Sequence, residues 1–284
     1  MRTLTAPRLA LLAALALTGA CGSPVPSRAS SSSSSAAPRE SAPAEQLEAP
    51  TLGEDGLYAL AGLRYREYVS GGAEADANLP MVILIHGLGD NPESFEGLVQ
   101  GFDTPARFII PRGFDSHGRG WSWFAYRGSE QGVEETAAGI AASADKLAPA
   151  IEALSQARPT QGKPVVSGFS QGGMLSFTLA VRHGELLSAA YPIGGWLPEP
   201  LWPADASQAA SCPPILAFHG EEDERVPLAP TRAGVEHMRG LGYEVELRTY
   251  SGLGHSINRE LHAQLMQAFR TQLQQLSSPA PTPR

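Results

Sequence analysis

Ser170 is the residue of this chain best placed for nucleophilic chemistry, because it lies in the stretch Gly168-Phe169-Ser170-Gln171-Gly172. A short apolar run, residues 164–167, precedes this stretch, and an apolar helical pattern follows it. Glycines on both sides permit a turn from strand to helix that is too sharp for larger side chains. The turn would present the hydroxyl at a helix N-terminus, where free N–H groups favour developing negative charge. Serine is also a favoured helix N-cap, so its function depends on its partners.

A serine hydroxyl is a weak nucleophile, and it needs a histidine to take its proton and a carboxylate to orient that histidine. In enzymes with this turn, the acid and then the histidine follow the serine along the chain. Asp223 follows the apolar run 214–218, and His255 follows the alternating run 244–250. Both runs are typical of strands, so the two side chains are expected on loops at the sheet edge where Ser170 also lies. The acids that compete with Asp223 in its run are Glu221, Glu222 and Glu224.

The apolar run 81–85 ends in His86-Gly87-Leu88-Gly89-Asp90, whose glycines allow backbone N–H groups to turn inward. A tetrahedral oxyanion is stabilised by one N–H group from such a loop and one from the residue after the nucleophile. Leu88 and Gln171 are therefore the predicted oxyanion-hole donors. The remaining histidines are expected to shape loops, to be solvated or to lie on helices: His86, His117, His183, His219, His237 and His262.

Four motifs together resemble the phospholipase/carboxylesterase family of α/β-hydrolases, which includes small bacterial carboxylesterases and acyl-protein thioesterases. They are His86-Gly-Leu-Gly-Asp, Gly168-Phe-Ser-Gln-Gly-Gly, His219-Gly-x-x-Asp-x-x-Val-Pro and Gly254-His-Ser-Ile. The resemblance covers residues 56–276 and implies that Ser170 is the nucleophile, Asp223 the acid and His255 the base. Residues 121–124, Trp-Ser-Trp-Phe, are similar to the Trp-Phe element of that family, although the neighbouring residues differ.

Strand-like runs alternate with helix-like runs along the rest of the chain. The predicted strands are residues 63–69, 81–85, 107–110, 165–167, 189–193, 214–218 and 244–250, and the predicted helices are residues 92–100, 133–154, 172–182, 230–239 and 258–274. This alternation predicts an α/β fold with a mostly parallel central sheet and helices on both faces, as in the α/β-hydrolases that the motifs resemble. The loops that follow Pro111 and Gly194 have about 15 to 20 residues each, so no large lid domain is expected.

The four tryptophans fall in those two loops, which are expected to open above Ser170. We expect a largely apolar cleft there for an acyl or aryl group. The predicted substrate-binding residues are Trp121, Trp123, Phe124, Trp196 and Leu197. The alternative is that some of these rings pack the loops onto the core. Because there is little room for a helical lid, an esterase for short or medium acyl groups is favoured over a lipase for long-chain triglycerides.

Residues 1–20 are predicted to be a signal peptide, with two arginines ahead of an apolar stretch that is too short to span a bilayer. The run Leu17-Thr-Gly-Ala-Cys resembles a lipobox, so Cys21 is predicted to carry a lipid. The alternative is an ordinary signal peptide that is cut after Ala20. Gly22 rather than Asp after the cysteine fits delivery to the outer membrane of a Gram-negative cell. The expected location is therefore exported and lipid-anchored, on either side of that membrane.

The remaining composition limits the domains and the partners. Residues 21–50 are rich in Ser, Ala and Pro and are predicted to be a disordered linker, residues 51–277 a single catalytic domain, and residues 278–284 a disordered tail. The formal charge of −8 argues against nucleic acid and against electrostatic docking to anionic lipid, so membrane contact is expected through Cys21 alone. No zinc-like Cys/His spacing and no phosphate-binding glycine loop occurs in the sequence, so no metal or cofactor is expected.

These features predict a serine carboxylesterase that hydrolyses carboxylic esters or thioesters of short to medium acyl or aryl groups through an acyl-enzyme. Its partner is then a small-molecule or lipid ester, and its oligomeric state stays open. A serine peptidase or amidase on the same fold is the alternative enzyme. Matched ester and peptide substrates would distinguish the two, because an amide leaving group demands stronger protonation by His255. The third hypothesis is a non-catalytic surface binding protein, in which one or more residues of the triad would be missing.

Overall fold

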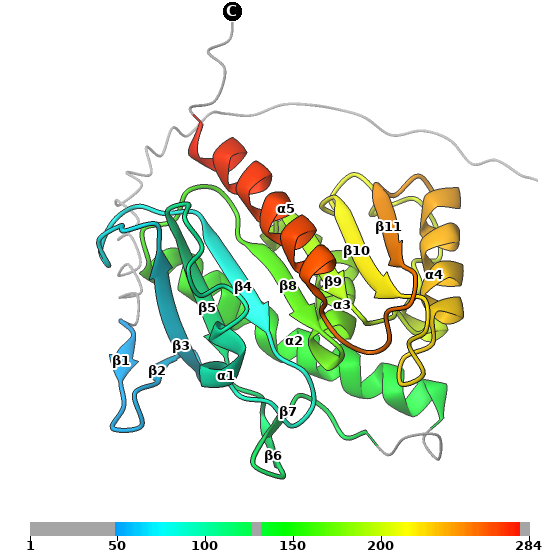
Figure 1. Ribbon diagram of the computed structural model, residues 1–284, viewed down its shortest axis with the longest axis horizontal. Coiled ribbons are helices and arrows are strands. Elements are labelled where there is room, and N and C mark those ends of the chain that lie inside the picture. Colours follow the sequence, from blue (N-terminus) through cyan, green and yellow to red (C-terminus); the bar gives the residue numbers. More distant parts are fainter. Residues whose placement is uncertain (1–48, 127–131, 279–284) are drawn as a thin grey trace, which may run out of the picture. The chain divides into compact units, whose positions relative to one another are not determined.

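Nine strands form one sheet in the part of the chain that the computed structural model describes, residues 49–126 and 132–278 (Figure 1). In sheet order they are β1 (Thr51–Leu52), β2 (Tyr58–Leu60), β3 (Leu63–Ser70), β5 (Ala106–Pro111), β4 (Met81–Ile85), β8 (Val165–Phe169), β9 (Ala189–Ile193), β10 (Ile215–Gly220) and β11 (Val245–Tyr250). The strands from β5 to β11 run parallel, whereas β1, β2 and β3 are antiparallel to their neighbours. The predicted mostly parallel sheet is confirmed.

Helices cover both faces of this sheet, as the alternation of the sequence predicts. They are α1 (Pro92–Glu96), α2 (Val133–Ala157), α3 (Gln171–Arg182), α4 (Leu228–Gly240) and α5 (Arg259–Ser277). One core cluster lies between the sheet and α2, α3 and α4, and the other lies between the opposite face and α1 and α5 (Figure 1). On β8, Val166 belongs to the first cluster and Val165 to the second. Alternate side chains of a central strand thus face opposite layers, which explains the continuous apolar runs.

Several elements differ from those predicted, among them β1 and β2, which form where the sequence predicts no strand. The helix expected over residues 92–100 ends at Glu96, since Gly97, a poor helix former, follows it. A two-stranded ribbon, β6 (Asp115–His117) and β7 (Gly120–Ser122), forms in the loop after β5, where the sequence predicts no strand.

The predictions for the ends of the chain fall largely on residues 1–48 and 279–284. The signal peptide, the lipidated Cys21, almost all of the linker and almost all of the tail therefore lie outside the described residues. Within the part of the chain that is described, no helix combines the length and the apolar character needed to cross a bilayer.

The carboxyl ends of β4, β8, β10 and β11 lie at the same edge of the sheet, because these strands are parallel. The segments that follow them carry the loop at 86–90, Ser170, Asp223 and His255. This is the edge at which open α/β sheets bind ligands. The topology thereby collects all four sequence motifs in one place.

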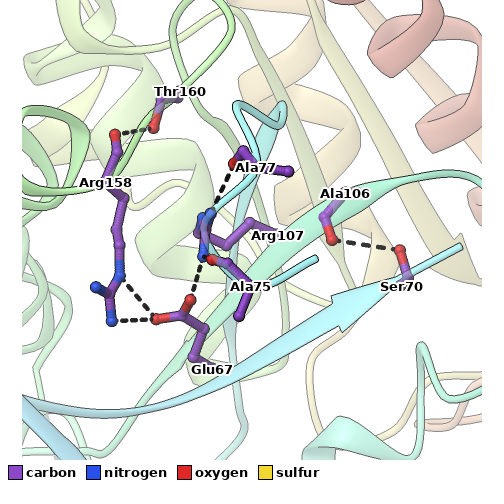
Figure 2. A network of polar contacts seen from close by, with 8 residues as sticks. All are labelled: Glu67, Ser70, Ala75, Ala77, Ala106, Arg107, Arg158 and Thr160. Atoms are coloured by element: carbon purple, nitrogen blue, oxygen red, sulfur yellow. Dashed lines mark hydrogen bonds and ion pairs between the residues drawn. The ribbon is translucent and has the colours of Figure 1, made fainter. Parts of the chain in front are cut away.

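A buried charge network fastens the antiparallel part of the sheet to the parallel part (Figure 2). The guanidinium of Arg107 on β5 is fully buried and pairs with the carboxylate of Glu67 on β3. It also donates to the carbonyl oxygens of Ala75 and Ala77, each at 3.0 Å. Arg158, just after α2, donates to the other oxygen of Glu67 at 2.8 and 3.0 Å. The network therefore joins β3, β5, the segment before β4 and the end of α2.

Replacing Arg107 with alanine is expected to lower the free energy of unfolding by about 3–5 kcal/mol, because a buried carboxylate loses one of its two cationic partners. Urea denaturation followed by tryptophan fluorescence measures this change. The control is Arg248→Ala, which breaks the exposed pair with Glu246 and should cost less than about 1 kcal/mol. Equal losses in the two variants would show that the buried network does not hold the sheet.

Candidate active site

Ser170 lies on the turn between β8 and α3, in a backbone conformation that residues other than glycine rarely adopt. Its φ is 57° and its ψ is −114°. This is the strained strand-to-helix turn that the Gly-x-Ser-x-Gly spacing predicts. The turn places the side chain at the start of α3, on the wall of a cavity.

The two glycines of the motif are required by a close approach between β4 and α3. A Cβ atom at Gly172 would lie 1.9 Å from the carbonyl oxygen of Ile85, and one at Gly168 would lie 2.5 Å from the same atom. Both distances are far inside van der Waals contact, so neither position accepts a side chain unless the backbone moves. Glycine at both positions therefore lets α3 begin directly against the end of β4.

A continuous hydrogen-bond chain joins the three residues that the sequence motifs select. The Ser170 hydroxyl donates to Nε2 of His255 at 2.9 Å, and Nδ1 of His255 donates to Oδ2 of Asp223 at 2.7 Å. The ring of Phe169 packs against the imidazole, with the ring centroids 4.7 Å apart. The structure thus brings together a hydroxyl, an imidazole and a carboxylate from three separate loops.

Asp223, rather than one of the acids beside it, contacts the histidine. Its side chain is almost fully buried, and its Oδ1 accepts from the backbone N–H groups of Arg225 and Val226 at 3.0 and 2.9 Å. The flanking acids are exposed, and they are Glu221, Glu222 and Glu224. Burial and backbone donors hold the carboxylate in one orientation, as is needed to set the tautomer of the imidazole.

Two buried histidines, His86 and His219, hold the adjacent loops in shape. The N–H group of Gly113 donates to Nε2 of His86 at 3.2 Å, so Nδ1 carries the proton and donates to the carbonyl of Gly87 at 2.7 Å. Nε2 of His219 donates to the carbonyl of Val226 at 2.8 Å. Burial lowers the pKa of both imidazoles below the ordinary value, so they are uncharged at neutral pH.

Leu88 and Gln171, the predicted oxyanion-hole donors, both line the cavity beside the nucleophile. The loop that carries Leu88 is tied to β7 by two backbone hydrogen bonds. The N–H of Gly89 donates to the carbonyl of Trp121 at 2.8 Å, and the N–H of Trp121 donates to the carbonyl of Asp90 at 2.9 Å. This pairing holds the loop after β4 against the ribbon, next to the start of α3.

The side chain of Gln171 has a positioning role that sequence reasoning missed. It is buried, its Oε1 accepts from the backbone N–H of Trp123 at 3.1 Å, and its Nε2 donates to the carbonyl of Phe124 at 3.1 Å. Trp123 in turn donates from Nε1 to the carbonyl of His86 at 2.9 Å. The segment after β7 is therefore fastened both to the nucleophile turn and to the loop after β4. No local pattern marks this role, because it joins residues 48 positions apart.

A cavity of about 410 Å³ opens beside the nucleophile, and a second of about 150 Å³ adjoins it. The first is lined by Gly87, Leu88, Asp90, Tyr126, Phe169, Ser170, Gln171, Met174, Arg225, Val226 and His255. Tyr126, Met174, Arg225 and Val226 also border the second cavity. The size and the largely apolar wall suit a small organic group. Across residues 49–126 and 132–278, no three His, Cys, Asp or Glu side chains gather in a way that could hold a metal ion.

Only Trp196 among the five predicted substrate-binding residues borders either cavity. The prediction is wrong for Trp123, Phe124 and Leu197, which are buried in the core with 1–3% of their surface exposed. Their loops are packed onto the sheet by these side chains, which is the alternative that the sequence left open. Trp121 lies under the guanidinium of Arg112, 4.0 Å from the ring centroid, and lines neither cavity. The lining residues that sequence reasoning missed include Tyr126, Met174, Arg225 and Val226.

A known protein family accounts for this combination of sheet, turn and loops. The family model described as Phospholipase/Carboxylesterase matches residues 69–276. The chain belongs to the phospholipase/carboxylesterase family. As a member of that family, it is a serine hydrolase that acts on ester bonds. The resemblance carried by the four sequence motifs is thereby confirmed.

Proteins similar to this chain include a thioesterase, carboxylesterases and an esterase of known structure. Acyl-protein thioesterase 1 of Gibberella zeae is 28% identical over 204 residues, which cover 64% of this chain and 86% of that protein. A probable inactive carboxylesterase of Oryza sativa subsp. japonica is 27% identical over 198 residues, or 62% of this chain and 78% of that protein. The crystal structure of esterase PE8 has a TM-score of 0.63 at 22% identity, covers 74% of this chain and 99% of that one, and shares the fold.

Lowering the pH from 7 to 5 is expected to destabilise the fold, because His86 binds a proton when the chain unfolds. The ordinary pKa of 6.5 applies to the unfolded chain, and burial lowers the pKa of His86 in the fold. Its contribution to stability is therefore present above pH 6.5 and is lost as the pH falls below it, by up to about 1.4 kcal/mol per pH unit. Urea denaturation at pH 7, 6 and 5 measures the slope.

His86→Gln should make this pH dependence shallower, because the replaced side chain does not titrate. His117→Gln is the control, since His117 on β6 is exposed. The free energy of unfolding of this variant should depend on pH as it does in the wild type. A slope for His86→Gln that equals the wild-type slope would contradict the prediction.

Proposed function

We propose that this chain is a carboxylesterase that hydrolyses carboxylic esters or thioesters of short to medium acyl or aryl groups, with Ser170 as the nucleophile. The observation that carries this proposal is the hydrogen-bond chain from Ser170 through His255 to Asp223, which starts on the wall of a largely apolar cavity. Family membership supports the ester as the class of bond, and the geometry of the site supports the role of each residue.

The first half of the reaction places an acyl group on the enzyme. His255 takes the hydroxyl proton on Nε2 while the oxygen of Ser170 bonds to the carbonyl carbon of the ester. Asp223 keeps the other ring proton on Nδ1 and stabilises the imidazolium that forms. His255 then gives its proton to the departing alkoxide or thiolate, and the acyl group stays on Ser170.

The negative charge on the carbonyl oxygen is stabilised, in this proposal, by the backbone N–H groups of Leu88 and Gln171. Gln171 is the first residue of α3, so its N–H group has no acceptor within the helix. The loss of one such donor typically raises the barrier by about 3–4 kcal/mol. Water then attacks the acyl group with His255 as base, and the free Ser170 hydroxyl is restored.

The dimensions of the site support short to medium acyl or aryl groups. A volume of about 410 Å³ lies near the lower end of the range for small-molecule sites, and Leu88, Phe169 and Met174 make its wall largely apolar. The thioesterase name of one relative supports thioesters as a second substrate class, since the serine attacks the same kind of carbonyl carbon.

A fluorophosphonate probe and 4-nitrophenyl butyrate test this proposal. The wild type should be labelled by the probe and should release nitrophenol from the ester. Ser170→Ala should lose the label and at least about 10⁴-fold of kcat, because the site keeps its donors but has no nucleophile. Ser116→Ala removes an exposed hydroxyl on β6 and should change neither result.

The same assay separates the acid of the triad from its neighbours. Asp223→Asn should lower kcat by about 10⁴-fold, because the imidazole is then held in the wrong tautomer. Glu222→Gln removes an exposed charge one residue away and is the matched control. Circular dichroism establishes that each variant is folded. A folded wild type that neither takes the label nor hydrolyses the ester would refute the proposal, and equal losses in the two acid variants would refute the role of Asp223.

We further propose that the chain is exported and held at a bacterial outer membrane by a lipid on Cys21. Support comes from the sequence of residues 17–22 alone, since these lie outside the described residues. Production of the full chain in a Gram-negative cell fed labelled palmitate should give labelled protein in the outer-membrane fraction. Cys21→Ser should lose the label and the membrane association, whereas Cys212→Ser, at a half-buried thiol, should keep both. An unlabelled wild type would contradict the anchor.

A further inference from the structure

Among the residues that the structure describes, Arg225 is the arginine on the walls of the two cavities, where no lysine is found, and the mechanism proposed above does not use it. It borders both the cavity that contains Ser170 and the adjoining cavity that contains Trp196. Its side chain is exposed, and its guanidinium makes no ion pair or hydrogen bond with any residue that the structure describes. Such a cation on a substrate-binding surface is free to bind a group of the ligand.

The backbone of Arg225 is held firmly even though its side chain is free. Its N–H group donates to Oδ1 of Asp223 at 3.0 Å, and the next N–H group, that of Val226, donates to the same oxygen at 2.9 Å. The carbonyl of Val226 is held in turn by His219 at 2.8 Å. The guanidinium is thereby attached to the same turn as the acid of the triad, so its range of positions relative to Ser170 is limited.

The two cavities adjoin along α3. Met174 borders both of them and lies one helical turn after Ser170, with its N–H group donating to the carbonyl of Ser170 at 3.0 Å. An ester has two arms, its acyl group and its alcohol group. When the ester is bound at the serine, one of these arms can therefore extend over Met174 and past Arg225 toward Trp196. The cation lies on the route of that arm rather than at the reacting carbonyl.

Among the described residues, the second part of this route carries a positive charge. Asp90 is the carboxylate that lines the first cavity outside the triad, and it accepts from the N–H of Asn91 at 2.8 Å. It does not border the second cavity, where Arg225 is the charged side chain among the lining residues of the described segments. Although the formal charge of the chain is −8, the described wall of this cavity therefore presents a cation without a carboxylate beside it on the wall. An arm that carries a negative group is attracted there, and a cationic arm is repelled.

We propose that the preferred substrate is an ester with a carboxylate on the arm that enters the second cavity, and that Arg225 binds this carboxylate. The proposal rests on the proposed function, because it names the class of ester that the same site accepts. A guanidinium suits this task, since its planar N–H donors match the two oxygens of a carboxylate. Arg225 is then a residue that determines specificity and takes no part in bond breaking.

Two pairs of esters test the proposal, and the members of each pair differ only in a carboxylate or a carboxamide. In the first pair this group ends the acyl arm, in the 4-nitrophenyl monoesters of adipic acid and adipamic acid. In the second pair it lies on the alcohol arm, in 4-butanoyloxybenzoate and 4-butanoyloxybenzamide. The measured quantity is the ratio of kcat/KM for the carboxylate to kcat/KM for the carboxamide. The pair that responds to substitution identifies the arm that reaches the second cavity.

Arg225→Gln should lower this ratio about three- to fivefold in one pair, which is the size expected for a partly exposed ion pair. Arg225→Glu should lower it further, because like charges repel. Arg232→Gln is the matched control, since Arg232 on α4 is exposed and borders neither cavity. It should leave both ratios at the wild-type value. Added salt should lower the wild-type ratio, because it screens an exposed pair.

The possible results separate this proposal from the proposed function. An unchanged ratio in both pairs for Arg225→Gln overturns the carboxylate proposal and leaves the esterase in place. An equal fall in Arg232→Gln also overturns it, because net charge rather than the site would then be responsible. A folded wild type that hydrolyses none of the four esters overturns the proposed function and this inference together.

Discussion

The close approach of α3 to the end of β4 is the constraint on which the rest of the site depends. The carbonyl oxygen of Ile85 occupies the space into which a side chain at Gly168 or Gly172 would project. Because the two elements meet there, Ser170 is held at positive φ and the loop after β4 runs beside it. Packing of β4, β8 and α3 into the two core clusters compensates for this strained conformation.

The acid is held in a different way, mainly by hydrogen bonds to the backbone. The carboxylate of Asp223 is buried and takes two backbone N–H donors on the oxygen that faces away from His255. His219 supports the same turn from behind through a backbone carbonyl. The triad therefore combines a strained turn at Ser170 with a buried carboxylate at Asp223 whose oxygens accept hydrogen bonds from protein groups. Its geometry depends on loops whose conformations are set by the main chain.

Sequence reasoning predicted the features that depend on local chemistry. The glycines around Ser170 and the order of acid and histidine led to the correct sheet edge, because turn sterics and strand direction can be read from neighbouring residues. The prediction was wrong for Trp123 and Leu197, because the neighbouring residues do not determine whether an aromatic or apolar side chain on a loop faces a cleft or the core. What decided the matter for Trp123 was a hydrogen bond to a carbonyl 37 residues away. The buried pair of Glu67 and Arg107 could not be predicted either, because its partners are 40 residues apart in the sequence.

The clamp made by the Gln171 side chain has a consequence for how this site can diversify. Its amide group fastens the segment after β7 to the nucleophile turn, and Trp123 fastens the same segment to the loop after β4, so changes in this floor of the active site disturb the chemistry itself. The rim is different, because Tyr126 and Arg225 project from it with exposed side chains. New substrate preferences can therefore arise by exchange of rim residues while the hydrolytic machinery beneath is inherited intact.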